Sequence, residues 1–249
     1  MMLKYISVEH LKGKRTFSHT FLILYPFLIS LLCIPFTTLM YSDINYFIPL
    51  IYNWWPTLFL PIGLSILVFQ SLDREKKAST DKYLFLLDTR LIWISKIITL
   101  SLYSLIANFM ITILSIVIQF ILYGSDIQIY CVIYASFVLW ITTLFIIPFS
   151  FIVGRLFKPL SAVIFNVIGM IISVFFITSN FWYFIPWSWS LRAITPIVKT
   201  RPNGTLLPEN DVLNTPEIVI PTCILSFGIF ILLSLIAVIL LKNRRGENT

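Results

Sequence analysis

The hydrophobic residues of this 249-residue chain lie in long runs that alternate with short polar segments. A helix needs about 20 mostly apolar residues to cross a bilayer. Six runs come close to or exceed this length, and they predict transmembrane helices at residues 21–41, 56–72, 97–123, 130–153, 160–178 and 218–241. Because the runs are continuous and do not alternate between apolar and polar positions, we expect helices and not the strands of a barrel.

The composition supports the same interpretation. Hydrophobic residues make up 58% of the chain and charged residues 12%, whereas soluble domains contain roughly 25% charged residues. We therefore expect an all-α integral membrane protein with a single transmembrane domain over residues 1–249. Residues 1–20 are polar and basic, and we expect an amphipathic helix there on the cytoplasmic surface. The run that follows is long enough to stay in the membrane as an anchor.

Lysine and arginine residues predict the orientation of the chain. Of the 18 Lys and Arg residues, only Arg192, Lys199 and Arg201 fall in the segments on one side of the predicted spans. The side with the excess of basic residues is usually cytoplasmic. The pattern therefore predicts that both termini are cytoplasmic and that residues 179–217 form a long extracellular loop. Because the basic residues are scattered between hydrophobic runs, we expect no nucleic-acid partner.

The sequence contains no pattern for catalysis or metal binding. His10 and His19 are the only histidines, and both precede the first predicted span. "GKRT" at residues 13–16 lacks the upstream glycine of a phosphate-binding loop. The predicted spans contain no ionisable residue, which argues against an ion-coupled transporter. We therefore expect no enzyme activity, no catalytic or metal-binding residue and no cofactor.

The predicted spans nevertheless contain polar residues and prolines. Asn108, Gln119 and Asn166 predict hydrogen bonds between helices, and the alternative is a polar lining for a substrate path. Prolines interrupt helical hydrogen bonding and favour kinks. Whether they give a fixed shape or act as hinges stays open for Pro26, Pro35, Pro61 and Pro148.

Residues 73–96 contain an unusual concentration of charge, beginning with "DREKKAST". Thr80 or Asp81 is a plausible N-cap, and leucines then recur at helical spacing, so the pattern predicts a short helix between the second and third spans. Asp88 offers a second cap from which the third span starts. The short helix is expected either to lie on anionic lipid or to fit a groove on a soluble partner.

Four segments resemble a known family: "EHLKGKRTF" near the N-terminus, "YNWWPTLFLPIG" at the second span, "DREKKAS" after it, and "WYFIPWSWSLRAITPI" after the fifth span. Over essentially its whole length the chain resembles the permease subunits of type-2 ABC exporters. Within that family it is most similar to the permeases of lantibiotic immunity transporters (the LanE and LanG subunits), and the E type is closer.

The resemblance implies six transmembrane helices in a half-transporter that works with a second permease subunit. A separate ABC ATPase, present as a dimer, would hydrolyse ATP. The loop between the second and third spans would contact this ATPase through a coupling set of residues: Arg74, Glu75, Lys76, Lys77, Lys82, Leu84 and Leu87. The family often has Gly-Thr where this chain has Ala78 and Ser79, so the contacts with the ATPase are expected to differ in detail.

The resemblance also implies a short re-entrant hairpin after the fifth span. The residues expected at an outer gate that handles substrate are Trp182, Tyr183, Trp187, Trp189 and Arg192. Aromatic residues suit a membrane interface, where they also serve as simple anchors. Arg192 is expected to pair with a carbonyl or a lipid headgroup, since like charges repel a cationic peptide.

The expected function is export of a lantibiotic, a cationic antimicrobial peptide, from the bacterial plasma membrane of the cell that produces it. The partners implied are the ABC ATPase, a second permease, membrane lipid and the peptide. Two alternatives remain from the sequence. One is a type-2 ABC permease for another drug or lipid, and the other is a membrane scaffold or sensor that transports nothing.

Overall fold

The computed structural model describes residues 2–14, 16–40, 46–78, 88–124 and 128–243. Helices account for nearly all of the regular structure in these ranges. The first half of the chain contains α1 (Met2–Lys14), α2 (Phe17–Met40), α3 (Phe47–Trp54), the π-helix η1 (Trp55–Phe59), α4 (Leu60–Ala78) and α5 (Thr89–Tyr123). The second half contains α6 (Ile129–Thr143), α7 (Ile146–Leu156), α8 (Ser161–Phe176), the 3-10 turn η3 (Trp182–Phe184), α9 (Pro186–Val198), the 3-10 turn η4 (Pro216–Ile218) and α10 (Val219–Asn243). An isolated bridge between Thr200 and Leu206 is the sole β-type pairing in the described ranges.

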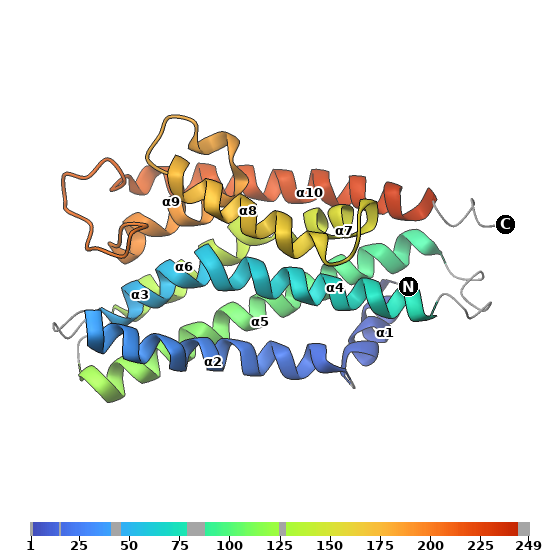
Figure 1. Cartoon of the computed structure of the whole chain (residues 1–249), viewed down its shortest axis with the longest axis horizontal. Helices are drawn as coiled ribbons and strands as arrows, with labels where there is room; N and C mark the ends of the chain where they lie inside the picture. Colours follow the sequence, from blue (N-terminus) through green and yellow to red (C-terminus); the bar gives the residue numbers. More distant parts are fainter. Residues whose placement is uncertain (1, 15, 41–45, 79–87, 125–127, 244–249) are drawn as a thin grey trace.

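The long helices lie side by side along one direction (Figure 1). α1 lies across one end of this bundle, and the last turns of α10 reach the same end. The opposite end holds the segment between α8 and α10, which includes α9. Charged residues of α1 and of the end of α4 therefore lie far from the aromatic segment that precedes α9.

Among the described residues, five helical segments are long and apolar enough to cross a membrane, so the chain is a multi-pass membrane protein. These segments are Phe17–Leu39, Phe47–Lys76, Thr89–Leu122, Ile129–Leu156 and Pro216–Leu240. They match five of the six predicted spans. The helix at the remaining position, α8, is apolar but has 16 residues, which give a length of about 24 Å against a hydrocarbon core of about 30 Å.

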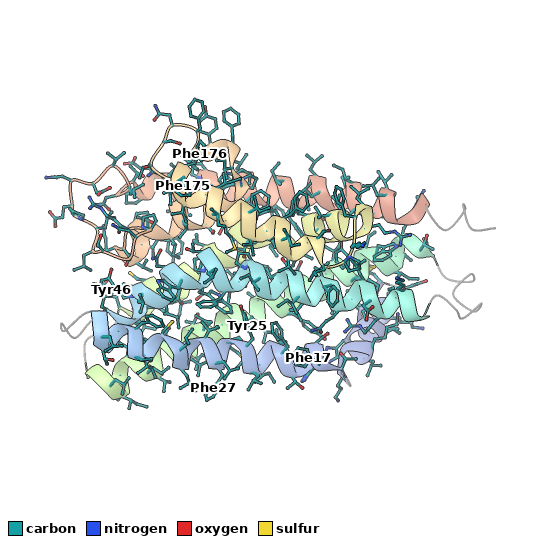
Figure 2. All side chains as sticks on the ribbon, in the orientation of Figure 1. Phe17, Tyr25, Phe27, Tyr46, Phe175 and Phe176 are labelled. Atoms are coloured by element: carbon teal, nitrogen blue, oxygen red, sulfur yellow. The ribbon has the colours of Figure 1, made fainter. Side chains whose placement is uncertain are left out.

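The interior combines a hydrophobic core with buried polar side chains, and the outside is covered with large apolar side chains. Asn108, Gln119 and Asn166 are at most 2% exposed, whereas large apolar side chains such as Phe175 (75% exposed) and Ile224 (69%) cover the outside. The outward side chains of the long helices are predominantly hydrocarbon (Figure 2). Lipid favours this arrangement because polar groups in a bilayer need partners inside the protein.

Proline interrupts two of the long segments. Leu144 and Phe145 form a turn that separates α6 from α7. Pro148 lacks an N–H group and so cannot bond to the carbonyl of Leu144, four residues earlier, which explains the break. Pro56 lies in η1, where the π-helix joins α3 to α4. Helix α2 continues through both of its prolines.

The predicted loop at residues 73–96 is wrong in its extent. Helix α4 continues through the charged residues to Ala78, and α5 begins at Thr89, so both ends of this region are helical. Lys, Glu and Arg are good helix formers, and the end of an apolar run marks the edge of the hydrocarbon and not the end of the helix. The Asp88 cap is confirmed: its carboxylate accepts the Arg90 N–H at 2.9 Å. The short helix predicted over residues 80–87 lies outside the described residues.

The predicted extracellular loop at residues 179–217 is also partly helical. It contains α9, which packs against α3, α6, α8 and α10. Nine consecutive residues of α9, from Ser188 to Pro196, are buried. Helix α9 is therefore part of the helical core, and only the residues on either side of it can be described as an open loop.

Candidate coupling site and outer segment

The charged end of α4 lies against α1 and α5 and forms with them a group of four ions, three of which are largely buried. Lys96 of α5 is 2% exposed, and its Nζ donates to Glu9 Oε2 at 2.6 Å and lies 2.9 Å from Glu75 Oε1. Lys12 Nζ donates to Glu9 Oε1 at 2.7 Å and to Glu75 Oε1 at 3.4 Å. We call Glu9, Lys12, Glu75 and Lys96 the ionic cluster.

The ionic cluster contains two carboxylates and two ammonium groups. Burial lowers the pKa of Lys12, but the hydrogen bond and the charge of Glu9, with a smaller contribution from Glu75, outweigh it and raise the pKa above its ordinary value. Lys12 therefore stays protonated at neutral pH. Since each ion has opposite charges beside it, the cluster offsets much of the cost of removing its members from water.

A second set of contacts fastens the same end of α4 to the start of α2. Arg74 Nη1 donates to Ser18 Oγ at 2.6 Å and to Thr16 Oγ1 at 3.2 Å. Ser18 in turn donates to Gln70 Oε1 at 2.5 Å. Thr16 also donates to the carbonyl of Gly13 at 2.8 Å, which closes the turn between α1 and α2. The end of α4 is thus held by two neighbouring helices and by the turn that joins them.

Tyr103 of α5 provides a neutral contact for α1. Its hydroxyl lies 3.1 Å from His10 Nδ1. Gly13 is buried against the same hydroxyl, because a Cβ atom added at Gly13 would lie 3.0 Å from it. Helix α1 was expected on the membrane surface. It is a helix as predicted, but one of its faces packs against α5.

The structure places the residues of the predicted coupling set differently from one another. Arg74 and Glu75 point to groups within the chain, whereas Lys76 is exposed. Lys77 belongs to the last turn of α4, and its side chain is outside the description. Lys82, Leu84 and Leu87 lie in residues 79–87, which the structure does not describe.

Sequence reasoning missed three members of the ionic cluster, namely Glu9, Lys12 and Lys96. Lys96 directly precedes an apolar run of membrane length, which was a usable signal because ionisable residues near membrane depth generally have partners. Glu9 and Lys12 are spaced for a pair on one helix face. Glu9 and Lys96 are 87 residues apart in the sequence, and no local sequence pattern predicts their contact.

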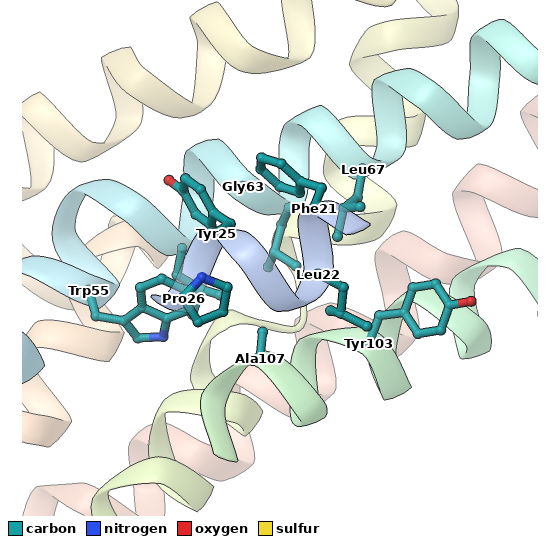
Figure 3. A pocket seen from close by; sticks show the side chains of 11 residues that line it. Phe21, Leu22, Tyr25, Pro26, Trp55, Gly63, Leu67, Tyr103 and Ala107 are labelled. Carbon is teal, nitrogen blue, oxygen red and sulfur yellow. The ribbon is translucent and has the colours of Figure 1, made fainter. Parts of the chain in front are cut away.

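A small apolar cavity of ≈ 20 Å³ lies between α2, α4 and α5 (Figure 3). Four aromatic side chains line it: Phe21, Tyr25, Trp55 and Tyr103. The three that have a polar tip use it elsewhere: Tyr25 bonds to the Phe59 carbonyl at 2.8 Å, Trp55 to Asn108 Oδ1 at 3.0 Å, and Tyr103 to His10. Only hydrocarbon therefore faces the cavity, which has room for about one methyl group and is expected to stay dry.

Two buried asparagines of the spans bond to neighbouring helices. Asn166 of α8 donates from Nδ2 to Ser65 Oγ of α4 at 2.8 Å and to Ser150 Oγ of α7 at 2.9 Å. Its Oδ1 accepts the indole N–H of Trp187 of α9 at 3.0 Å. The prediction of hydrogen bonds between helices is thus confirmed for Asn166, and also for Asn108 through its bond to Trp55.

Two of the three tryptophans of the predicted outer gate, Trp187 and Trp189, pack against other parts of the protein. Trp187 lies over Gly169 and meets the rings of Phe145 and Phe149 edge-to-face, with centroids 5.5 and 5.0 Å away. Trp189 is 2% exposed, and its Nε1 donates to the carbonyl of Tyr183 at 3.1 Å. These contacts fasten α9 to the bundle, so both side chains have a structural role whatever else they do.

The remaining members of the predicted outer gate differ in burial: Arg192 is buried, Trp182 is half-buried and Tyr183 is exposed. Arg192 is 7% exposed, donates from Nη2 to the Val212 carbonyl at 3.3 Å, and places its guanidinium carbon 5.6 Å from the ring centroid of Trp182. The carbonyl contact expected for Arg192 is therefore present. Tyr183 is 44% exposed, and its neighbours Phe181 and Phe184 are 60% and 69% exposed.

An ion pair closes the polar loop that follows α9. Arg201 Nε donates to Asp211 Oδ2 at 2.7 Å, and the Leu213 N–H donates to Asp211 Oδ1 at 2.8 Å. The Leu213 N–H is the largest influence on the carboxylate. Together with Arg201, and more weakly Arg192, it outweighs burial and holds the Asp211 pKa below its usual range.

We expect this loop to open in acid. A carboxyl with a depressed pKa in the folded state contributes stability above its unfolded pKa of about 3.9, and that contribution is lost as the pH falls through the folded pKa. Hydrogen exchange of residues 199–214, corrected for intrinsic rates, should be constant from about pH 8 to 5 and should rise below about pH 4. Asp211→Asn should exchange fast at every pH. Equal protection in parent and variant would contradict the prediction.

The chain was compared with protein-family models, with curated protein sequences and with solved structures. None of the three comparisons finds a significant match. The resemblance to type-2 ABC permeases therefore depends on the sequence motifs alone.

Proposed function

We propose that the chain is the membrane-spanning permease subunit of a type-2 ABC exporter in a bacterial plasma membrane. In this proposal α8 completes a sixth pass, and both termini are cytoplasmic. The observation that carries it is the construction of the charged end of α4. Contacts with α1, α2 and α5 hold this end in place, and the resemblance locates the contact with an ATPase in the segment from Arg74 to Leu87, which begins there.

The energy source in this proposal is a separate ATPase dimer. The sequence has no complete phosphate-binding loop, and the ions of the ionic cluster neutralise one another within the chain. Such a cluster is poorly suited to carrying a coupled ion, because its charges already have partners. Lys76, which is exposed at the end of α4, is the described member of the coupling set best located to meet a partner.

A second permease subunit is part of the proposal. The buried amides of Asn108 and Asn166 are used in bonds between helices of this chain. The apolar cavity of ≈ 20 Å³ is far too small for a peptide. The proposal locates the substrate path between this chain and a second permease, with the aromatic segment around Tyr183 at its outer end.

The proposed substrate is a lantibiotic, which is a cationic and amphipathic peptide. Three exposed aromatic side chains, those of Phe181, Tyr183 and Phe184, favour contact with such a peptide or with the lipid around it. Export of another drug or lipid would use the same machinery. Transport assays with several substrates separate these two possibilities, and a scaffold or sensor would fail all of them.

The experiment is co-purification of the tagged chain from its native membrane, with identification of any ABC ATPase and second permease that it retains. We expect the three subunits to form a complex, the isolated chain to hydrolyse no ATP, and Lys76→Ala to lower peptide resistance while membrane insertion stays normal. Lys14→Ala, an exposed lysine on α1, is the matched control and should keep resistance. Failure of any ATPase to co-purify would overturn the proposal. Full resistance in Lys76→Ala would show that Lys76 is not needed for the contact with the ATPase.

A further inference from the structure

We propose that the ionic cluster is a positioning device that makes α1, the charged end of α4 and the first turns of α5 a single unit, with Glu9 as its central positioning residue. The inference rests on the proposed function in one respect, which is that the partner of this unit is an ATPase. It goes beyond that function by giving the N-terminal helix a defined role, in which α1 sets the orientation at which the end of α4 meets the partner.

The bonding pattern of the cluster carries the first step. Glu9 uses both carboxylate oxygens, one for each lysine, and Glu75 Oε1 lies within 3.4 Å of both lysines. Each lysine therefore bridges the two carboxylates, and positive and negative groups alternate around a closed ring. If any one member is removed, the two ions that contacted it have the same charge as each other and share one counter-ion in place of two.

Burial makes this ring restrictive. The side chain of Lys96 is 2% exposed, that of Glu9 is 7% exposed and that of Glu75 is 10% exposed, whereas the fourth member, Lys12, is 39% exposed at the edge of the cluster. If α1 moved away, Lys96 and Glu75 would lose a partner in a region that water reaches poorly, which is costly. The ring therefore opposes separation of α1 from α4 and α5 far more strongly than an ion pair on an open surface would.

The sequence of α1 fixes the register of this contact. Glu9 is the one acidic residue in α1, "MLKYISVEHLKGK". A shift of α1 by one turn would bring an uncharged or basic side chain opposite Lys96, so a single docked position satisfies the cluster. Gly13, one turn after Glu9, permits the close approach to Tyr103, and this neutral contact selects the same register.

The unit extends to the start of α2. Arg74 precedes Glu75 on α4 and bonds to Thr16 and Ser18, which flank the start of α2. Displacement of the α4 end would therefore strain contacts with α1 and with α2 together. We infer that a force applied where α4 leads into residues 79–87 is transmitted to these helices and is not absorbed by bending of the α4 end alone.

Hydrogen exchange of the full chain in lipid nanodiscs tests the positioning role directly. The variants are Glu9→Gln, Lys96→Met and the double variant E9Q/K96M, with Lys4→Met as a matched control on the exposed side of α1. We expect exchange of the amides of residues 2–14 to rise at least about tenfold in each single variant. The double variant should rise less than the sum of the singles, because Lys12 and Glu75 still neutralise each other. Lys4→Met should match the parent.

Unchanged exchange in the single variants, or strictly additive effects in the double variant, would overturn the inference. If a single variant fails to insert, Glu9→Asp replaces it. This change keeps the charge but shortens its reach, and it should still accelerate exchange in α1 while exchange in α10 stays at the parental level. Parental exchange of α1 in Glu9→Asp, with Glu9→Gln unable to insert, would reduce Glu9 to a general requirement for folding and would also overturn the inference.

A second measurement separates this inference from the proposed function. In the complex with the ATPase, we expect E9Q/K96M to export less peptide for each ATP hydrolysed, a ratio that mere loss of protein would not change. Absence of any ATPase complex with the parent chain would overturn the proposed function and leave the exchange result standing. An unchanged ratio in a variant with a loosened α1 would overturn the role assigned to α1 in transmission.

Discussion

Replacing Gly169 with alanine should release α9 from the bundle. A Cβ atom added at Gly169 would overlap Cδ2 and Cε2 of the Trp187 indole. The ring has little room to retreat, since Phe145 and Phe149 contact it and Asn166 accepts its N–H. Overpacking of this kind costs about 3 kcal/mol when the neighbours cannot move. The apparent melting temperature in detergent, followed by intrinsic tryptophan fluorescence, should therefore fall clearly.

Gly228→Ala is the matched control for this substitution. It makes the same change within a helix at a position with no atom within 4 Å of the new Cβ, and it should be neutral or stabilising by about 0.5–1 kcal/mol. In addition, Gly169→Ala should cost little in a Trp187→Ala background, because the overlapping ring is gone. The explanation fails if Gly169→Ala and Gly228→Ala unfold at the same temperature.

Replacing Asn166 with leucine should weaken the junction of four helices. The change removes the amide bonds to Ser65 and Ser150 and the acceptor for the Trp187 N–H. A single hydrogen bond between membrane helices contributes roughly 0.6 kcal/mol on average. Three such contacts are lost together here and buried polar atoms are left without a partner, so we expect a loss of about 2–3 kcal/mol.

A nearby serine provides the control for Asn166→Leu. Ser173 lies on the same helix and is equally buried, but its hydroxyl donates to the Met170 carbonyl of its own helix at 2.7 Å. Ser173→Ala should therefore change the melting temperature little. If Asn166→Leu unfolds at the same temperature as the parent, side-chain packing, and not this set of hydrogen bonds, holds α9 in place.

The membrane character of the chain was predictable because it depends on local composition. Apolar runs of membrane length identify the helices, and the polar residues within them, such as Asn166, had to bond to neighbours because lipid offers no partner. The ends of the helices were less predictable. Asp73–Ala78 reads as a loop when hydropathy alone is considered, although Lys and Glu favour a helix in water as well.

The ionic cluster and the burial of α9 could not be predicted from local patterns. Glu9 and Lys96 are far apart in the sequence, and the choice of Lys96 over other lysines depends on how α1 and α5 pack. Trp187 and Trp189 follow the predicted fifth span in the way that interfacial tryptophans do. The notch at Gly169 that receives Trp187 exists only after α8 and α9 have come together.

The burial of the ionic cluster also determines how α1 responds to salt. By composition, α1 resembles the basic helices that high salt washes from membrane surfaces, because mobile ions screen exposed charges within about 10 Å at 0.1 M ionic strength. The contacts of Lys96 with Glu9 and Glu75 are shielded from those ions by protein. Helix α1 should therefore stay with the bundle in concentrated salt, while its exposed lysines lose their attraction to anionic headgroups.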